Sequence, residues 1–278
     1  MASGVILARG RHPTMAAALV PKPWYRSNSL RLQAFGVAGV LLTLFTWELL
    51  ARAGLLDIRF IPPPSAIAVG LGTLIATGVI VQETVSTLFR LVIGYAIGVG
   101  LGIAVGFVMA ASVYARAALY PLFAATFPLP KLALLPLMMM LLGVDEEAKI
   151  AMVAVSAFYL LPLNVMAAID NIEPIYLQVV RNLGVSRWLY WRTVAVPCAL
   201  PMIVAGLRVA WSISLIVIVA TEMLMSRNGL GFMIWKSSQV FDVVTMFSAF
   251  ITIATLGYLS HVALDAISRR LVPWQGTS

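Results

Sequence analysis

The sequence contains six apolar runs, each long enough to cross a lipid bilayer as a helix. A hydrocarbon core of about 30 Å requires about 20 apolar residues in helical conformation. The runs lie near residues 33–51, 86–110, 117–142, 150–169, 202–225 and 245–267. Only 11% of the residues are charged, whereas soluble domains contain about 25%. We therefore predict an all-α integral membrane protein with six transmembrane helices.

Basic residues orient the six helices, because Lys and Arg favour the cytoplasmic ends of spans. With both termini in the cytoplasm, only five basic residues between the spans lie outside: Arg52, Arg59, Lys149, Arg227 and Lys236. We expect a cytoplasmic N-terminal tail at residues 1–32, a transmembrane domain at 33–268 and a cytoplasmic C-terminal tail at 269–278. The net charge of +8 is thus explained by topology, and we expect no nucleic-acid partner.

A seventh apolar stretch, residues 66–81, is too short to span the membrane. It contains three glycines and follows three consecutive prolines, Pro62 to Pro64. We predict that it forms a helix lying along the outer membrane interface.

The second run carries glycines at a spacing of four residues. They are Gly94, Gly98, Gly102 and Gly106. Because residues four apart share one helical face, these glycines predict a stripe without side chains, against which another helix packs closely.

The third run contains several prolines that interrupt its backbone hydrogen bonds. Pro128, Pro130 and Pro136 fall near its middle, with Lys131 beside the closest pair. Broken backbone is tolerated at membrane depth where protein or a wet cavity covers it. This segment is a candidate for the translocation pathway, although a purely structural kink explains the prolines equally well.

Charged residues within the runs are few, and each is a functional candidate. We expect Arg90 and Arg208, near the ends of their runs, to extend toward the membrane surface. For Lys131 and Glu222 two alternatives remain, either contact with a solute in the pathway or a structural role as an ion pair or interface anchor.

The segment 173–197 is a basic, glycine-interrupted loop between the fourth and fifth runs. We predict one short helix from Pro174 to Leu183, a turn at Gly184 and a second short helix from Ser186 to Thr193. Such an amphipathic element outside the bilayer suits docking of a soluble motor protein. The candidate contact residues are Leu177, Gln178, Val179, Val180, Arg181, Leu183, Gly184, Ser186 and Arg187. Among them Leu177, Val180 and Leu183 have the spacing of an apolar helical face.

This loop resembles the EAA loop of binding-protein-dependent ABC import permeases of type I. In that pattern Glu-Ala-Ala is followed after three residues by Gly and, nine residues later, by I-x-L-P. Here Gln178 to Val180 take the place of Glu-Ala-Ala, Gly184 is the glycine, and Val194 to Pro197 close the motif.

Further strings are similar to the nitrate, sulfonate and taurine importer group. They are Thr87 to Arg90, Pro128 to Lys131, Gly206 to Arg208, Thr221 to Leu224 and Gly229 to Gly231.

The resemblance implies a non-catalytic membrane subunit of the bacterial inner membrane, with 33–268 as the permease domain and 173–197 as a coupling-helix loop. It also implies two ATPase subunits that bind ATP and Mg, a second permease copy as a homodimer, an extracytoplasmic substrate-binding protein, and surrounding lipid. The solute expected from the resemblance is a small organic or inorganic anion such as a sulfonate, nitrate or carboxylate.

Other function classes are less favoured by the sequence. No G-x-x-x-x-G-K-[ST] segment is present, so we expect no cofactor bound by this chain itself. One cysteine and two distant histidines offer no metal site. An ion-coupled secondary transporter or channel remains the alternative, whereas an intramembrane enzyme lacks a nucleophile–base pair.

Overall fold

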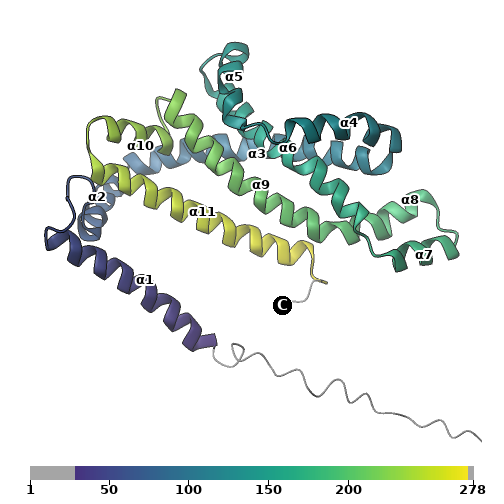
Figure 1. The fold of residues 1–278 in the computed structure, drawn as a ribbon, viewed down its shortest axis with the longest axis horizontal. Coiled ribbons are helices and arrows are strands. Elements are labelled where there is room, and N and C mark those ends of the chain that lie inside the picture. The colour runs from purple at the N-terminus through teal and green to yellow at the C-terminus, as the bar shows by residue number, and fades with distance from the viewer. Residues whose placement is uncertain (1–28, 275–278) are drawn as a thin grey trace, which may run out of the picture. The chain divides into compact units, whose positions relative to one another are not determined.

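The computed structural model describes residues 29–274, and every regular element within that range is helical (Figure 1). Five helices are long and apolar enough to cross a membrane, and a bent helix pair makes up to six. The predicted all-α fold is confirmed. Most of the predicted N-terminal tail, and the last four residues of the C-terminal tail, lie outside the described residues.

The chain divides into two units, Met1–Leu56 and Asp57–Ser278. In the first unit, α1 (Ser29–Arg52) contains the candidate span Ala34–Arg52, close to the predicted 33–51. All the other helices belong to the second unit.

Three long helices form the core of the second unit. They are α3 (Val79–Ala111), α6 (Glu146–Asp170) and α9 (Val196–Met225). Leu91 of α3, Val153 of α6 and Ile218 of α9 are buried together in one cluster. Burial of such side chains stabilises the packing by about 1.5–3 kcal/mol each relative to exposure in water.

The glycine stripe of α3 lies directly against α6. A Cβ atom added to Gly94 would lie 2.6 Å from the carbonyl oxygen of Ile150, and one added to Gly106 would lie 2.6 Å from Cβ of Val165. Gly98 and Gly102 meet α6 in the same way. The partner of the stripe is therefore a helix of the same chain.

The start of α3 differs from the prediction. Most of the seventh apolar stretch, 66–81, lies in α2 (Pro64–Ala76), a separate short helix that ends before Gly78, where φ is +77°. After this turn α3 begins at Val79, seven residues before the predicted span. The first turns of α3 include the polar residues Gln82 and Glu83, so the apolar pattern did not extend over them.

One end of the unit is closed by α2, α10 (Leu230–Gln239) and α11 (Val243–Leu271). Ile80 of α3, Leu230 and Ile234 of α10 and Ala249 of α11 are buried in one cluster. Leu71 of α2 packs against it.

The predicted third span is two helices. α4 (Val113–Thr126) is followed by a 3₁₀ turn at Lys131–Leu134 and by α5 (Leu135–Leu142), with a bend of 96° between the two halves. Proline disfavours helical conformation in the preceding residue and lacks an N–H donor. Pro128 and Pro130 therefore account for the break.

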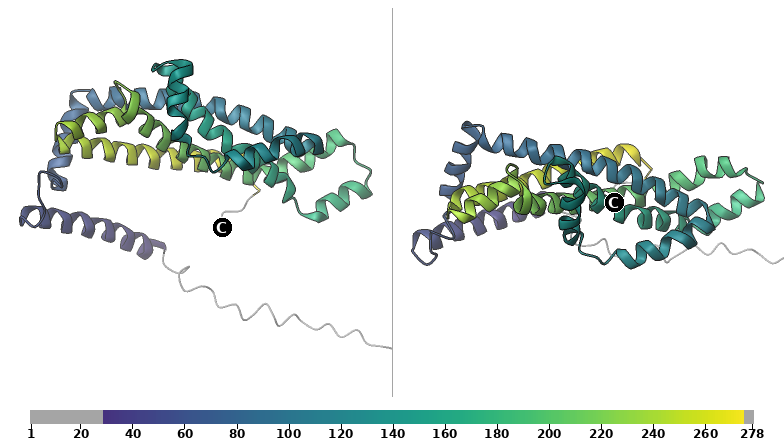
Figure 2. Two further views of the ribbon diagram at one scale, coloured as in Figure 1. Left: turned by 45° about the horizontal axis from the view of Figure 1, so that its top comes forward. Right: turned by 90° about the horizontal axis from the view of Figure 1, so that it is seen from above.

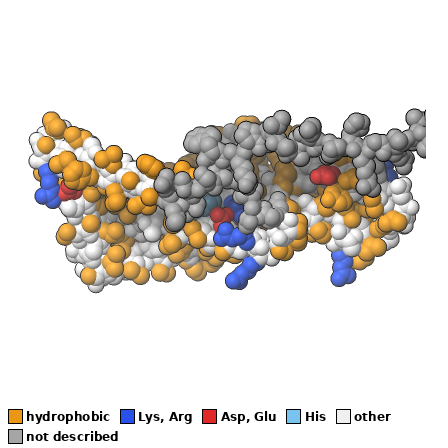
Figure 3. Space-filling view, turned by 90° about the horizontal axis from the view of Figure 1, so that it is seen from below, with side chains coloured by type: hydrophobic (Ala, Val, Ile, Leu, Met, Phe, Trp, Pro, Cys, Tyr) orange, Lys and Arg blue, Asp and Glu red, His pale blue; other side chains and the backbone are white. Residues whose placement is uncertain are grey.

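The remaining helices, α7 (Pro174–Asn182) and α8 (Arg187–Tyr190), form a hairpin at the opposite end of the unit from α2 and α10 (Figures 1 and 2). On the face drawn in Figure 3, hydrophobic side chains are spread widely and charged ones are few. This surface composition suits contact with lipid.

Candidate functional site

The hairpin between α6 and α9 follows the predicted helix–turn–helix pattern. α7 spans Pro174–Asn182, and Gly184 turns the chain with φ of +60°, a conformation that residues with a Cβ rarely adopt. α8 (Arg187–Tyr190) begins after Ser186, whose hydroxyl accepts a hydrogen bond from the Leu189 amide. The loop is therefore an ordered pair of short helices.

The second short helix is not separate from α9, contrary to the prediction. A π-helical turn, Trp191–Ala195, connects α8 to α9, so that Arg187–Met225 is one candidate span. Pro197 and Pro201 cannot donate backbone hydrogen bonds, and a π turn lets the surrounding ladder adjust to them. A displacement of α8 would therefore reach α9 without an intervening loop.

The hairpin exposes apolar side chains. Ile175, Val179 and Leu183 are exposed and are spaced four residues apart, which places them on one face of α7. Leu183 is 73% exposed, and Trp188 of α8 is 75% exposed. Single exposed apolar residues are ordinary, but a stripe at a chain reversal indicates a contact surface.

The three residues predicted for the apolar contact face differ in exposure. Leu177 and Val180 are half-buried, whereas Leu183 is exposed. The exposed stripe and the predicted face therefore share only Leu183.

Two contacts hold the hairpin to the end of α3. Nη2 of Arg187 donates to the carbonyl oxygen of Ala111 at 2.8 Å, so a basic side chain caps the C-terminus of α3. The rings of Phe107 and Trp191 meet edge to face, with centroids 6.2 Å apart. Arg187 thus has a partner within this chain.

Lys131 lies in the break between α4 and α5. Its Nζ donates to the carbonyl oxygens of Phe127 at 2.5 Å and Leu129 at 3.1 Å. The same Nζ lies 5.2 Å from the ring centroid of Phe127 and 5.3 Å from that of Tyr159 on α6. The proline pattern therefore predicted both the break and the cation beside it.

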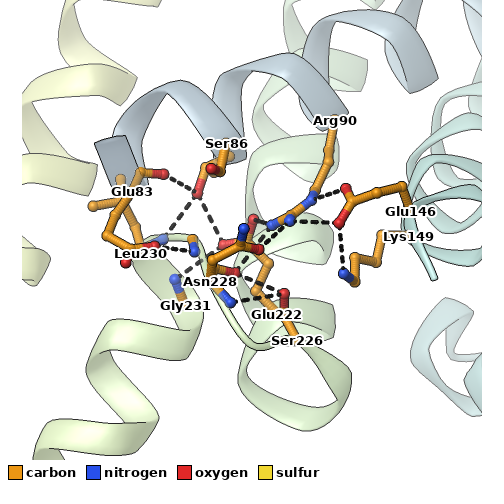
Figure 4. A network of polar contacts seen from close by, with 12 residues as sticks. Glu83, Ser86, Arg90, Glu146, Lys149, Glu222, Ser226, Asn228, Leu230 and Gly231 are labelled. Atoms are coloured by element: carbon orange, nitrogen blue, oxygen red, sulfur yellow. Dashed lines mark hydrogen bonds and ion pairs between the residues drawn. The ribbon is translucent and has the colours of Figure 1, made fainter. Parts of the chain in front are cut away.

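Arg90 and Glu222 form an ion pair inside the core, drawn in Figure 4. Nη1 of Arg90 lies 2.6 Å from Oε1 of Glu222, and the side chains are 2% and 0% exposed. Oε2 of Glu222 accepts hydrogen bonds from the Thr87 hydroxyl at 2.9 Å and the Gly231 amide at 3.0 Å. A buried carboxylate requires such a counter-charge and hydrogen bonds to both of its oxygens.

Arg90 also joins this pair to α6 and to the loop before α10. Its Nη2 donates to Oε1 of Glu146 at 2.8 Å and to the side-chain oxygen of Asn228. Glu146 accepts a further hydrogen bond from Lys149 at 2.9 Å. A cavity of about 470 Å³ borders Glu146, Lys149 and Asn228, so the outer edge of the network is accessible.

These contacts correct the expectation that Arg90 extends to the membrane surface. Arg90 lies four residues before Gly94, so it shares the face that packs on α6. Glu222 forms an internal ion pair, as the structural alternative for this residue predicts. Arg208 also has a partner, since its Nη1 lies 2.6 Å from Asp265 of α11.

Sequence reasoning missed the role of Glu146 and Asn228. Their pairing with Arg90 joins residues 56 and 138 positions apart, and no local pattern encodes it. Within residues 29–274 there is no group of three metal-ligating side chains.

Comparison with known proteins identifies the family to which this chain belongs. The family model of the binding-protein-dependent transport system inner membrane component matches residues 98–273. The taurine transport system permease protein of Escherichia coli (strain K12) is 30% identical over 258 residues, covering 91% of this chain and 93% of that protein. The nitrate import permease protein of Leptolyngbya laminosa is 31% identical, covering 69% and 68% respectively.

A solved structure shares the fold. The inward-facing MetNI methionine ABC transporter aligns with a TM-score of 0.61 at 19% identity, covering 69% of this chain and 96% of that one. The chain belongs to the family of binding-protein-dependent transport system inner membrane components, the permease subunits of ABC importers.

Proposed function

We propose that this permease subunit carries a small anion across the inner membrane, driven by ATP hydrolysis on a separate ATPase. Three of the similar proteins are named for taurine, aliphatic sulfonates and nitrate. Taurine and the sulfonates carry a sulfonate group, and nitrate is itself an anion. The shared chemistry is a compact, delocalised negative charge.

The coupling proposal rests on the apolar side chains that the α7–α8 hairpin exposes. Ile175, Val179 and Leu183 form an exposed stripe on α7, at the position of the EAA-like loop. An amphipathic helix with one exposed apolar face suits a groove on a soluble partner. The ATPase is that partner, and it binds ATP and Mg, whereas this chain binds no cofactor and has no catalytic role.

The coupling residues are Gln178, Val179, Leu183, Gly184 and their neighbours. Approach of the two ATPase subunits moves α7 and α8, and the continuous helix Arg187–Met225 carries that movement toward the opposite end. A rigid helix that links two sites is a physical route for switching between inward-facing and outward-facing states. The broken span with Pro128, Pro130, Lys131 and Pro136 borders the pathway.

The remaining assembly follows from the same proposal. Two copies of this chain form a homodimer in lipid, with both termini cytoplasmic, and an extracytoplasmic binding protein delivers the solute.

The rival secondary transporter needs a carboxylate that can release its coupling ion, and Glu222 is enclosed in an ion pair. That arrangement favours the importer.

The experiment is affinity purification of the tagged chain from native membranes in mild detergent, followed by mass spectrometry. We expect an ABC ATPase at an equal number of copies. Recovery of the chain without any ATPase, after chemical crosslinking in the intact membrane, would overturn the proposal.

A further inference from the structure

The ammonium group of Lys131 has no carboxylate partner among the described residues, unlike three other basic groups in the candidate spans. Arg90 pairs with Glu222, Arg208 pairs with Asp265, and Lys149 pairs with Glu146. Within residues 29–274, no carboxylate lies within ion-pair distance of Lys131. A charge at membrane depth requires a partner or a wet cavity. Among these described residues, backbone carbonyl oxygens and aromatic rings hold the ammonium, and no negative charge neutralises it.

The surroundings of Lys131 orient its charge without neutralising it. Two of its three N–H donors are taken by the carbonyl oxygens of Phe127 and Leu129. The rings of Phe127 and Tyr159 add cation–π attraction. One donor and a full positive charge are left for an incoming group.

Tyr159 supplies a second polar group beside the cation. Its ring is half-buried on α6, and its hydroxyl donates to no acceptor among the described residues. The rings of Phe123, Phe158 and Tyr159 stack edge to face or tilted around this point. The environment thus combines a cation, a free hydroxyl and an apolar wall, as small-molecule sites do.

We propose that Lys131 and Tyr159 bind the anionic head group of the transported solute at the break between α4 and α5. The proposal rests on the proposed function, since it assigns the solute's charge to a named contact within the pathway. The third Lys131 N–H and the Tyr159 hydroxyl donate to the anion. The carbonyl contacts hold the ammonium in place, which lowers the entropy lost on binding.

A purely structural role for Lys131 makes a different prediction. If the ammonium only caps the open carbonyls at the end of α4, anions leave its environment unchanged. Lys236 provides the matched control, because it also lies over an aromatic ring, with Nζ 6.0 Å from the Phe232 centroid. Lys236 is exposed on α10, outside the break.

The test is carbon-13 NMR of the full chain in nanodiscs after biosynthetic incorporation of lysine labelled with carbon-13 at Cε, which leaves each ammonium with its three N–H donors. The chain has only four lysines, and single Lys→Arg variants assign their signals. Sodium ethanesulfonate and sodium nitrate are titrated against sodium gluconate at constant ionic strength. We expect a saturable shift of the Lys131 signal with at least one probe, and only a linear drift for Lys236.

Tyr159→Phe should raise the dissociation constant obtained from that saturable shift at least threefold. Lys131→Met in cells should raise the KM of uptake at least tenfold. Lys131→Arg should raise it less, and Lys236→Met should leave it unchanged.

A Lys131 signal that drifts like that of Lys236 with both probes would refute the site. If an ATPase is recovered while this shift is absent, only the anion site fails. A saturable shift without any ATPase would leave the site standing and reject the importer.

Discussion

Arg90 and Glu222 form a fully buried ion pair that joins α3 to the end of α9, with Nη1 and Oε1 2.6 Å apart. The pair is satisfied on all sides by Thr87, Asn228 and Gly231. Its neighbour Glu146 remains 46% exposed and ties α6 to the same arginine. The network therefore holds three core helices together at the end of the unit opposite the hairpin.

Loss of one partner from this pair should destabilise the fold strongly. Arg90→Met leaves the Glu222 carboxylate buried without its counter-charge, at a cost of about 3–5 kcal/mol. Thermal unfolding in detergent, followed by the helical circular dichroism signal, measures the loss. Combining Arg90→Met with Glu222→Gln should recover part of it. The control is Arg59→Met, which breaks an exposed pair with Asp57 and should change little. Equal losses for Arg90→Met and Arg59→Met would contradict the structural role.

The glycine stripe of α3 should tolerate no added methyl group. In Gly98→Ala the new Cβ collides with the Ala154 carbonyl of α6, and such overpacking costs about 1–3 kcal/mol. Gly100→Ala is the matched change on the same helix, where a Cβ meets no atom within 4 Å. It should be neutral, or stabilising by up to about 1 kcal/mol. Chemical unfolding of both variants decides between these outcomes, and similar stabilities would show that α3 and α6 do not pack along the stripe.

Gly184→Arg should abolish stimulation of ATP hydrolysis by solute while membrane insertion persists. The φ of +60° penalises any side chain by about 1–2 kcal/mol, and the arginine places bulk on the surface that faces the motor. Gly54→Arg imposes the same kind of strain, because Gly54 has φ of +74° and open space around it. ATPase assays of the reconstituted complex compare the two, and retained stimulation in Gly184→Arg would sink the coupling role of the turn.

Arg187 should position the hairpin rather than contact the motor. Arg187→Gln loses the hydrogen bond to the Ala111 carbonyl, worth about 0.5–1.5 kcal/mol. Hydrogen exchange of the α7 and α8 amides should therefore become several-fold faster. Arg181→Gln is the control, since within residues 29–274 no hydrogen bond or ion pair involves the Arg181 side chain. Unchanged exchange in Arg187→Gln would remove the argument for a positioning role.

Local patterns predicted the parts of this structure that depend on neighbouring residues. The four-residue spacing of Gly94 to Gly106 predicted a close helix contact, and Pro128 and Pro130 predicted the break near Lys131. The turn at Gly184 was equally local, because only glycine adopts its backbone conformation readily.

The polar network around Arg90 could not be predicted from local sequence patterns. It depends on which helices meet, and Arg90, Glu146 and Glu222 come from three of them. One signal was available, since Arg90 continues the glycine spacing by one step and so belongs to the buried face. The continuity of α8 with α9 was also missed, because the second short helix was predicted to end at Thr193, whereas a π turn continues it into α9.

Contact between the α7–α8 hairpin and an ATPase can be detected by site-specific photocrosslinking in native membranes. A photoreactive amino acid replaces Leu183 on the hairpin, or Tyr258 on α11 as a control of similar exposure, 73% against 68%. If the hairpin contacts the ATPase, position 183 should give an adduct with an ABC ATPase and position 258 should give none. No ATPase adduct from position 183, or equal adducts from both positions, would contradict that contact.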